Sequence, residues 1–121
     1  MLNGLIIKRG VPIDGNFTIP LKTGIDYTGC VLQIIGKLNV NDNDSKSIIN
    51  ITSNNGGIVP VLSSDKITAT YKISGEATAD LPANRVTAIH YELNLTYQDE
   101  DYSHVLELGR FAVVPRVKLT I

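Results

Sequence analysis

The amino-acid sequence predicts a single all-β domain over residues 1–121, an antiparallel β-sandwich of about seven to nine short strands. Three observations support this prediction. Apolar and polar residues alternate along many segments, whereas few windows repeat with the period of a helix. Clusters of Gly, Asn, Asp and Ser separate the alternating segments about every ten residues. Finally, a length of 121 residues with 43% hydrophobic residues suits one globular core.

Two prolines predict which strands lie at sheet edges. The alternating segment 16–21 contains Pro20, and the segment 56–63 contains Pro60. Because proline has no N–H to donate to a ladder, both strands are expected at an edge or at a bulge. The segment 29–35, by contrast, is apolar on nearly both faces, which predicts a central strand. Further strands are predicted at the segments 46–52 and 68–74.

The most regular alternation lies in the segment 88–97, which predicts a strand with one buried and one solvated face. The apolar face carries Tyr91, Leu93, Leu95 and Tyr97. The polar face carries His90, Glu92, Asn94 and Thr96. A short helical turn is expected just before this strand, near residues 75–80, with Ser74 as its cap and Pro82 as its end.

The segment 103–121 is expected to pair with this strand through an acidic loop at 98–103. Its apolar residues change phase, from the even positions Leu106 and Leu108 to the odd positions Phe111 and Val113. A period of two shifts only when a residue is inserted, so we predict a β-bulge at Gly109, in the left-handed conformation. Pro115 is expected to end the strand or to pass it to an edge.

Both ends of the chain contain apolar residues whose role the pattern leaves open. Residues 1–13 form either a first strand of the sandwich or an arm that lies across a neighbouring subunit, and the end of the chain raises the same question. The possible interface residues are Leu5, Ile6, Ile7, Val117, Leu119 and Ile121.

The bulk composition gives no sign of a nucleic-acid or membrane partner. The net charge of −1 provides neither the basic footprint of a nucleic-acid-binding protein nor a polybasic membrane patch. No apolar segment approaches the roughly 20 residues that span a bilayer, and the N-terminus lacks the pattern of a signal peptide. The single cysteine, Cys30, excludes an internal disulfide and is interpreted as a small core residue.

Candidate sites for chemistry are weak. The carboxylates at 41–45 and 99–101 lack the remaining ligands of a calcium loop and are interpreted as solvated loops. His90 and His104 could face each other across a hairpin and bind zinc with Glu92, but a zinc site needs at least three protein ligands in good geometry, and the two histidines are interpreted as exposed cross-strand residues. We therefore predict no enzyme activity, no catalytic residue, no metal and no cofactor.

Aromatic residues offer one further possibility, the stacking of a sugar. Tyr27, Tyr71 and Tyr102 could be exposed, whereas Tyr91 and Tyr97 fall on the apolar face of their strand. A carbohydrate-binding module is therefore kept as an alternative of another class.

Four segments resemble a family of virion domains of tailed bacteriophages, the immunoglobulin-like N-terminal domains of baseplate upper proteins. The segments are FTIPLKTGIDYTGCVLQIIGK, ITSNNGGIVPVLSS, SGEATADLPANRVTAIHYELNLTYQDED and VLELGRFAVVPRV. The resemblance implies an immunoglobulin-like β-sandwich. The residues that carry it define the fold: Gly29, Leu81, Pro82, Tyr91, Leu93, Gly109, Phe111, Val113 and Pro115.

The resemblance implies a non-enzymatic structural protein of the virion, made in the cytoplasm of the host bacterium. Its expected partners are other virion structural proteins, in a homo-oligomer or symmetric array of the tail, baseplate or neck. An alternative position is the phage head, as a capsid decoration protein. Two features depart from the family: the segment 83–90 is longer, and the sequence stops after the sandwich where baseplate proteins continue. A small accessory protein is therefore expected.

Overall fold

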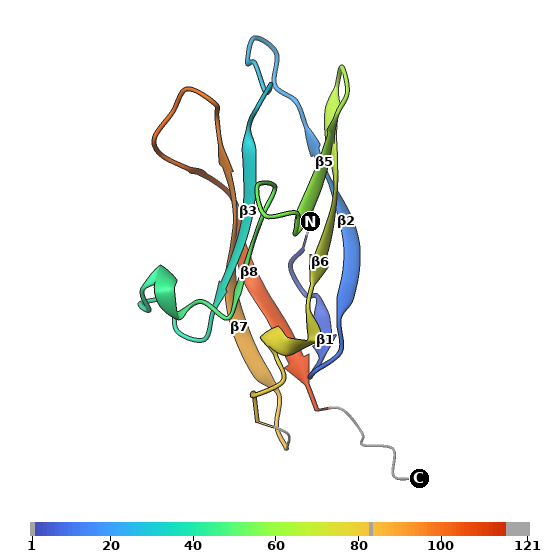
Figure 1. Cartoon of the computed structure of the whole chain (residues 1–121), viewed down its shortest axis with the longest axis vertical. Helices are drawn as coiled ribbons and strands as arrows, with labels where there is room; N and C mark the ends of the chain where they lie inside the picture. The colour runs from blue at the N-terminus through green and yellow to red at the C-terminus, as the bar shows by residue number, and fades with distance from the viewer. Residues whose placement is uncertain (1, 83, 116–121) are drawn as a thin grey trace.

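The computed structural model describes residues 2–82 and 84–115. Within them, eight strands form two sheets that stack as a β-sandwich (Figure 1). The five-stranded sheet has the order β1-β8-β7-β3-β4 and the three-stranded sheet the order β2-β6-β5. The bounds are β1 Ile6–Lys8, β2 Ile13–Pro20, β3 Val31–Lys37, β4 Ile49–Thr52, β5 Ile58–Leu62, β6 Lys66–Ile73, β7 Thr87–Thr96 and β8 His104–Val114.

The strand order is that of an immunoglobulin domain. All pairs are antiparallel except β1 with β8, which is parallel. β3, β7 and β8 lie together as strands C, F and G do, and β2, β6 and β5 as strands B, E and D do. β4 extends the first sheet in the position of strand C′ of variable-type domains. The predicted immunoglobulin-like β-sandwich is therefore confirmed.

The core lies between the two sheets and is built from alternate residues of each strand. β3 lies between β7 and β4, as predicted for a strand that is apolar on both faces, and its Leu32 and Ile34 are fully buried. Tyr91 stacks on Phe111 with ring centroids 4.3 Å apart. Because the strands alternate, the side chains between these core residues point to the outer face of each sheet, where a partner could reach them.

The segment that could have been an arm forms part of this chain's own sheet. β1 pairs with β8, with Ile7 opposite Val113, and Ile7 is only 1% exposed. Ile7 is therefore unavailable to a neighbouring subunit, whereas Ile6 points outward and is 62% exposed. Leu5 is partly buried against the core. Val117, Leu119 and Ile121 lie outside the described residues.

Both proline-containing strands lie at sheet edges, as predicted. β2 and β5 flank β6, and neither has a second neighbour among the described strands. The Ser63 N–H donates to the Lys66 carbonyl at 2.9 Å, so the even-numbered residues of β6 bond to β5. The even-numbered residues of β5 and β2, Pro60 and Pro20 among them, therefore direct their backbone polar groups away from β6. The missing N–H of each proline costs no ladder hydrogen bond.

The bulge in β8 lies three residues earlier than predicted. Leu93 pairs with Glu107 but Asn94 pairs with Val105, so the extra residue is Leu106. Gly109 pairs regularly with Tyr91 and is not among the glycines with positive φ. The prediction of a left-handed Gly109 was therefore wrong. The apparent change of phase arises because Leu106 and Leu108 face outward, whereas Phe111 and Val113 face the core.

The short helical turn near 75–80 is a 3-10 turn at Gly75–Ala77. Two details of its prediction were wrong, because Ser74 makes no capping side-chain hydrogen bond and the turn ends well before Pro82. The residue that fixes it is the buried Thr78, whose Oγ1 accepts a hydrogen bond from the Gly10 N–H at 2.8 Å. This bond ties the turn to the connection between β1 and β2.

Candidate functional site

The outer face of the five-stranded sheet carries a surface hollow lined by both apolar and ionisable side chains. The strand register places Ile35 of β3 beside Glu92 of β7, and Glu92 beside Leu108 of β8. The next row along the strands holds Lys37, His90 and then Arg110. Apolar and ionisable side chains thus lie in neighbouring rows on one open face.

A hollow of about 200 Å³ lies over these two rows, and we call it the β7–β8 hollow. Ile35 is 5% exposed and lies at its base. Leu108 is 67% exposed and Val40, from the β3–β4 loop, is 64% exposed, so both stand at the rim. The hollow is defined by the side chains of Ile35, Lys37, Val40, His90, Glu92 and Leu108. Its size suits a single inserted side chain better than a small-molecule substrate.

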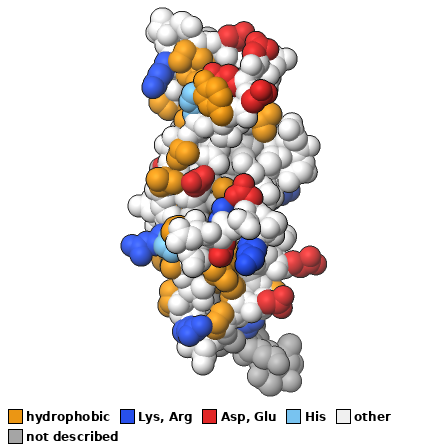
Figure 2. Space-filling model, turned by 90° about the vertical axis from the view of Figure 1, so that its left-hand side faces the viewer, with side chains coloured by type: hydrophobic (Ala, Val, Ile, Leu, Met, Phe, Trp, Pro, Cys, Tyr) orange, Lys and Arg blue, Asp and Glu red, His pale blue; other side chains and the backbone are white. Residues whose placement is uncertain are grey.

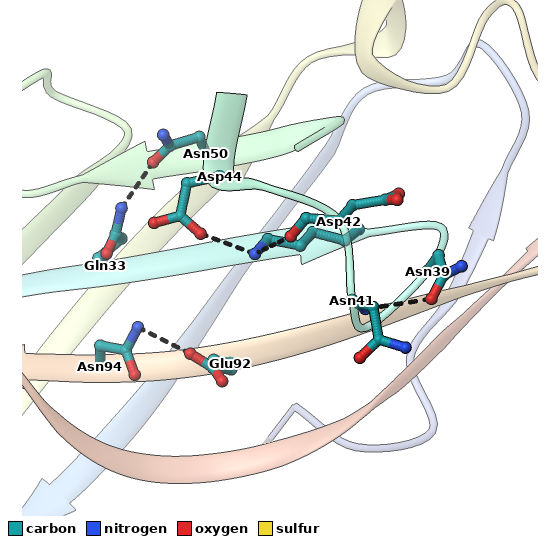
Figure 3. Close-up of polar contacts among 9 residues, drawn as sticks. Gln33, Asn39, Asn41, Asp42, Asp44, Asn50, Glu92 and Asn94 are labelled. Atoms are coloured by element: carbon teal, nitrogen blue, oxygen red, sulfur yellow. Dashed lines mark hydrogen bonds and ion pairs between the residues drawn. The ribbon is translucent and has the colours of Figure 1, made fainter. Parts of the chain in front are cut away.

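Lys37 holds the loop that brings Val40 to this rim. Its Nζ donates to the Asp44 carboxylate at 2.7 Å and to the Asp42 carbonyl at 2.8 Å. The adjacent turn is closed by the side chain of Asn39, which accepts from the Asn41 N–H at 3.1 Å (Figure 3). The carboxylate-rich segment 41–45 therefore positions a loop. Within residues 2–82 and 84–115, no group of three His, Cys, Asp or Glu side chains is placed to hold a metal ion.

A strip of amides borders the hollow. Gln33 of β3 donates to the Asn50 side chain of β4 at 2.9 Å, and Asn94 of β7 donates to Glu92 at 3.4 Å (Figure 3). Asn94 was expected on the solvated face, but it is only 7% exposed. Its Oδ1 is buried without a hydrogen-bond partner in the described structure. The border of the hollow thus offers hydrogen-bonding groups around an apolar centre.

The two histidines do not face each other. In the β7–β8 register His90 pairs with Arg110, whereas His104 pairs with Leu95. The His104 ring bonds instead to Glu100 of the β7–β8 loop, at 2.7 Å. The zinc arrangement considered from the sequence is therefore not formed by these residues.

The tyrosines are mostly part of the core. Tyr27 and Tyr71, expected as candidates for exposure, are 7% and 4% exposed. Tyr91 is buried and Tyr97 packs partly buried against the core, as predicted. Tyr102 alone among the five tyrosines is largely exposed, at 61%. A single exposed ring does not make the stacking platform that favours a carbohydrate module.

A polar pair, the buried Tyr91 and the partly buried Glu107, lies beneath the hollow on the core side of β7 and β8. The Tyr91 hydroxyl donates to Glu107, and the Leu2 N–H donates to the same carboxylate oxygen at 2.7 Å. Burial raises the pKa of Glu107, but the hydrogen bonds it accepts outweigh burial and hold the pKa below its ordinary value of 4.5. Burial, with the Glu107 contact, raises the pKa of Tyr91. The pair therefore remains a phenol and a carboxylate at neutral pH, and it ties the N-terminal segment to β8.

The other residues that the family resemblance named as fold-defining lie in a turn, against the core or at the end of a strand. Gly29 lies in a turn at φ +70°, a conformation that favours glycine. Leu81 packs partly buried against the core, and Pro115 follows the end of β8. Cys30 is also partly buried, and burial raises the pKa of its thiol, which fits a core residue better than a nucleophile.

Sequence reasoning assigned the most exposed apolar residues of the hollow to other roles. Leu108 was placed in the family motif, and Val40 directly precedes the segment 41–45, which was interpreted as a solvated loop. The phase change in β8 was the available signal, since it reports that Leu106 and Leu108 face away from Phe111 and the core. Figure 2 shows the outer face of the five-stranded sheet, with apolar side chains spread between charged ones.

Comparisons with known proteins include a likeness to a solved structure. No family model matches the chain, and no curated protein matches its sequence. Among solved structures, the chain is similar to the periplasmic chaperone SfaE, with 11% sequence identity and a TM-score of 0.49 over 95% of this chain. The chain spans 56% of the chaperone chain. No helix among the described residues has the length and apolar character to cross a membrane.

Proposed function

We propose that the chain is a non-enzymatic structural protein of a tailed-phage virion, which docks on neighbouring subunits through the outer face of its five-stranded sheet. The observation that carries this proposal is the β7–β8 hollow, where Leu108 and Val40 expose apolar side chains beside one another. The sequence resemblance described above supports the virion as the setting.

The hollow has the composition of a protein–protein interface. Such interfaces combine an apolar centre with a polar rim that makes hydrogen bonds. Here the apolar part comes from Ile35 at the base of the hollow and from Leu108 and Val40 at its mouth, and the polar Gln33 and Asn50 lie on the same face nearby. Burying one large aliphatic side chain contributes about 1.5–3 kcal/mol, so two exposed side chains give a useful but modest gain. Modest interfaces suffice where many copies bind together in one particle.

Substitution of Leu108, at the mouth of the β7–β8 hollow, tests the proposal. The assay is co-sedimentation of the purified chain with phage particles that lack it. We expect wild type to bind and Leu108→Asp to bind at least about tenfold more weakly, because the substitution removes the exposed apolar side chain and sets a second carboxylate beside Glu92, which makes the surface costlier to desolvate.

Val59→Asp is the matched control. Val59 lies on β5 of the other sheet and is 55% exposed, so the same charge is introduced on a surface that the proposal does not use. Both variants should melt within a few degrees of wild type, because neither residue is in the core. Wild type that does not sediment with particles, or Leu108→Asp that binds as well as Val59→Asp, contradicts the proposed function.

A further inference from the structure

Three of the four sheet edges are blocked or short. On β5, Pro60 occupies a position whose backbone points away from β6, so it offers no N–H to a neighbouring strand. On β4, the Asn55 side chain covers the edge, accepting from the Thr52 N–H at 3.0 Å and donating to the Asn50 carbonyl at 3.4 Å. The third of these edge strands, β1, is only three residues long. Edges that are short, that are capped by a side chain, or that carry a proline in the middle of the strand, as Pro60 does in β5, resist pairing with other chains.

The edge of β2 is open. Asp14, Asn16 and Thr18 are exposed, and their N–H and C=O groups point away from β6. No hydrogen bond to these backbone groups is formed within residues 2–82 and 84–115. Pro12 and Pro20 limit the open stretch, each four residues from Asn16. In Figure 1 β2 runs along the margin of its sheet. Within this eight-residue strand, the outward backbone groups of Asp14, Asn16 and Thr18 form a template for one more strand.

We propose that β2 pairs antiparallel with β2 of a second copy of this chain, about a two-fold axis at Asn16. This inference rests on the proposed function, since it names one partner of the structural protein. The pairing joins two three-stranded sheets into one continuous sheet. Asn16 faces its own copy and Asp14 faces Thr18, which allows about six backbone hydrogen bonds. Pro12 of each copy lies opposite Pro20 of the other copy, beyond the paired stretch, where no backbone N–H is needed for a hydrogen bond.

The side chains of β2 favour a second copy in this register. Like charges are kept apart, because each Asp14 lies opposite a neutral Thr18 and the two Asp14 carboxylates stand four residues apart, roughly 13 Å. Each Asp14 also has Lys72 of its own β6 directly beside it. On the inner side, Gly15 lies opposite Phe17, so the larger side chain meets a position without one. Sliding one copy by two residues in one direction instead sets Phe17 opposite Phe17. In the other direction it pairs Asp14 with Asn16, so the two Asp14 carboxylates stand only two residues apart.

Disulfide trapping tests this register directly. In the proposed dimer the two Asn16 Cα atoms are about 5.5 Å apart, within the range that a disulfide bridges. Asn16→Cys is expected to form a covalent dimer under mild oxidation, seen on a non-reducing gel. Thr70→Cys is the matched control, because Thr70 is exposed and lies beside Asn16, but on β6. Both variants and the wild type keep Cys30. No dimer with Asn16→Cys, or equal dimer with Thr70→Cys, overturns the proposed pairing.

A second pair of variants keeps the inference testable without a covalent link. Asn16→Pro removes an N–H that points away from β6, so it leaves the intramolecular ladder intact, and Asn16→Ala keeps that N–H. By analytical ultracentrifugation, wild type and Asn16→Ala are expected to self-associate, and Asn16→Pro at least about tenfold more weakly. Equal association of Asn16→Pro and Asn16→Ala overturns the inference.

Particle binding separates this inference from the proposed function. The hollow is on the other sheet, so Asn16→Pro is expected to sediment with particles in the assay that uses Leu108→Asp. A chain that binds particles but never self-associates overturns only the β2 pairing. A chain that self-associates but never binds particles overturns only the proposed function. If Asn16→Pro lowers particle binding while self-association is unchanged, β2 takes a strand of another protein and the second copy is excluded.

Discussion

Replacement of Gly109 tests why a glycine stands in the middle of β8. A Cβ built on Gly109 would lie 2.7 Å from Cε1 and 2.8 Å from the hydroxyl of Tyr91, and 2.6 Å from Oδ1 of Asn3. Asn3 can move, but Tyr91 is 2% exposed, stacked on Phe111 and bonded to Glu107. The ring therefore has no room to yield, and the glycine is required by contact rather than by backbone conformation.

The expected magnitudes follow from this contact. Forcing an extra carbon into a packed site destabilises the folded state by about 1–3 kcal/mol. Replacing a strand glycine with alanine stabilises it by about 0.5–1 kcal/mol, because the unfolded chain has less conformational entropy to lose. Gly109→Ala should therefore lower the free energy of unfolding by roughly 0.5–2 kcal/mol. Gly109→Asn and Gly109→Val should lower it further, because each places more atoms against the Tyr91 ring.

Urea unfolding followed by circular dichroism measures these differences as shifts of the midpoint. Gly24 is the control, because it has φ +84° and a Cβ there would meet nothing within 4 Å. At Gly24 the cost comes from the backbone, so Asn should be tolerated better than Ala. At Gly109 the order should be reversed. If Gly109→Asn is more stable than Gly109→Ala, or if neither variant shifts the midpoint, the contact explanation is wrong.

Three further predictions concern buried polar groups. The folded pKa of Glu107 lies below 4.5, so its contribution to the free energy of unfolding is complete above pH 4.5 and is lost as the pH falls through the folded pKa. Glu107→Gln should therefore lower the free energy of unfolding by about 1 kcal/mol at pH 7 and by less below pH 4, which urea midpoints measured across this pH range will show. Asn94→Leu should raise the free energy of unfolding by about 0.5–1.5 kcal/mol, because it removes a buried Oδ1 that has no partner, and a lower urea midpoint would contradict this. Burial raises the pKa of Cys30, so its alkylation by iodoacetamide at pH 8 should be at least about tenfold slower in the folded chain than in urea, and equal rates would refute it.

Local chemistry made part of the fold predictable. The prolines at positions 20 and 60 placed two strands at edges, because the absence of an N–H has the same meaning wherever the chain runs. The apolar segment 29–35 gave the central strand for a similar reason, since a strand that is apolar on both sides needs cover on both. Alternation in 88–97 located β7 with its buried face.

Other features depended on pairing between distant segments, which a sequence pattern does not contain. Alternation tells which residues share a face, but not which face is covered. The change of phase after Leu106 and Leu108 was therefore explained by a bulge at Gly109, although these two leucines face outward. Asn94 was expected to be solvated, and it is buried beside Glu92. The β7–β8 hollow likewise exists only once the register of three strands sets Ile35, Glu92 and Leu108 in one row.

The two proposed contact surfaces lie on different sheets, and this separation has a consequence for assembly. A copy that pairs through β2 leaves the outer face of its five-stranded sheet free, because strand pairing uses the plane of the sheet and docking uses its face. Two paired copies therefore present two hollows related by a two-fold axis. A particle with two equivalent sites at the matching separation would bind such a pair far more tightly than one copy, without any new contact. The avidity gain should disappear in Asn16→Pro while the weaker single-site binding remains, a combination that neither surface alone would produce.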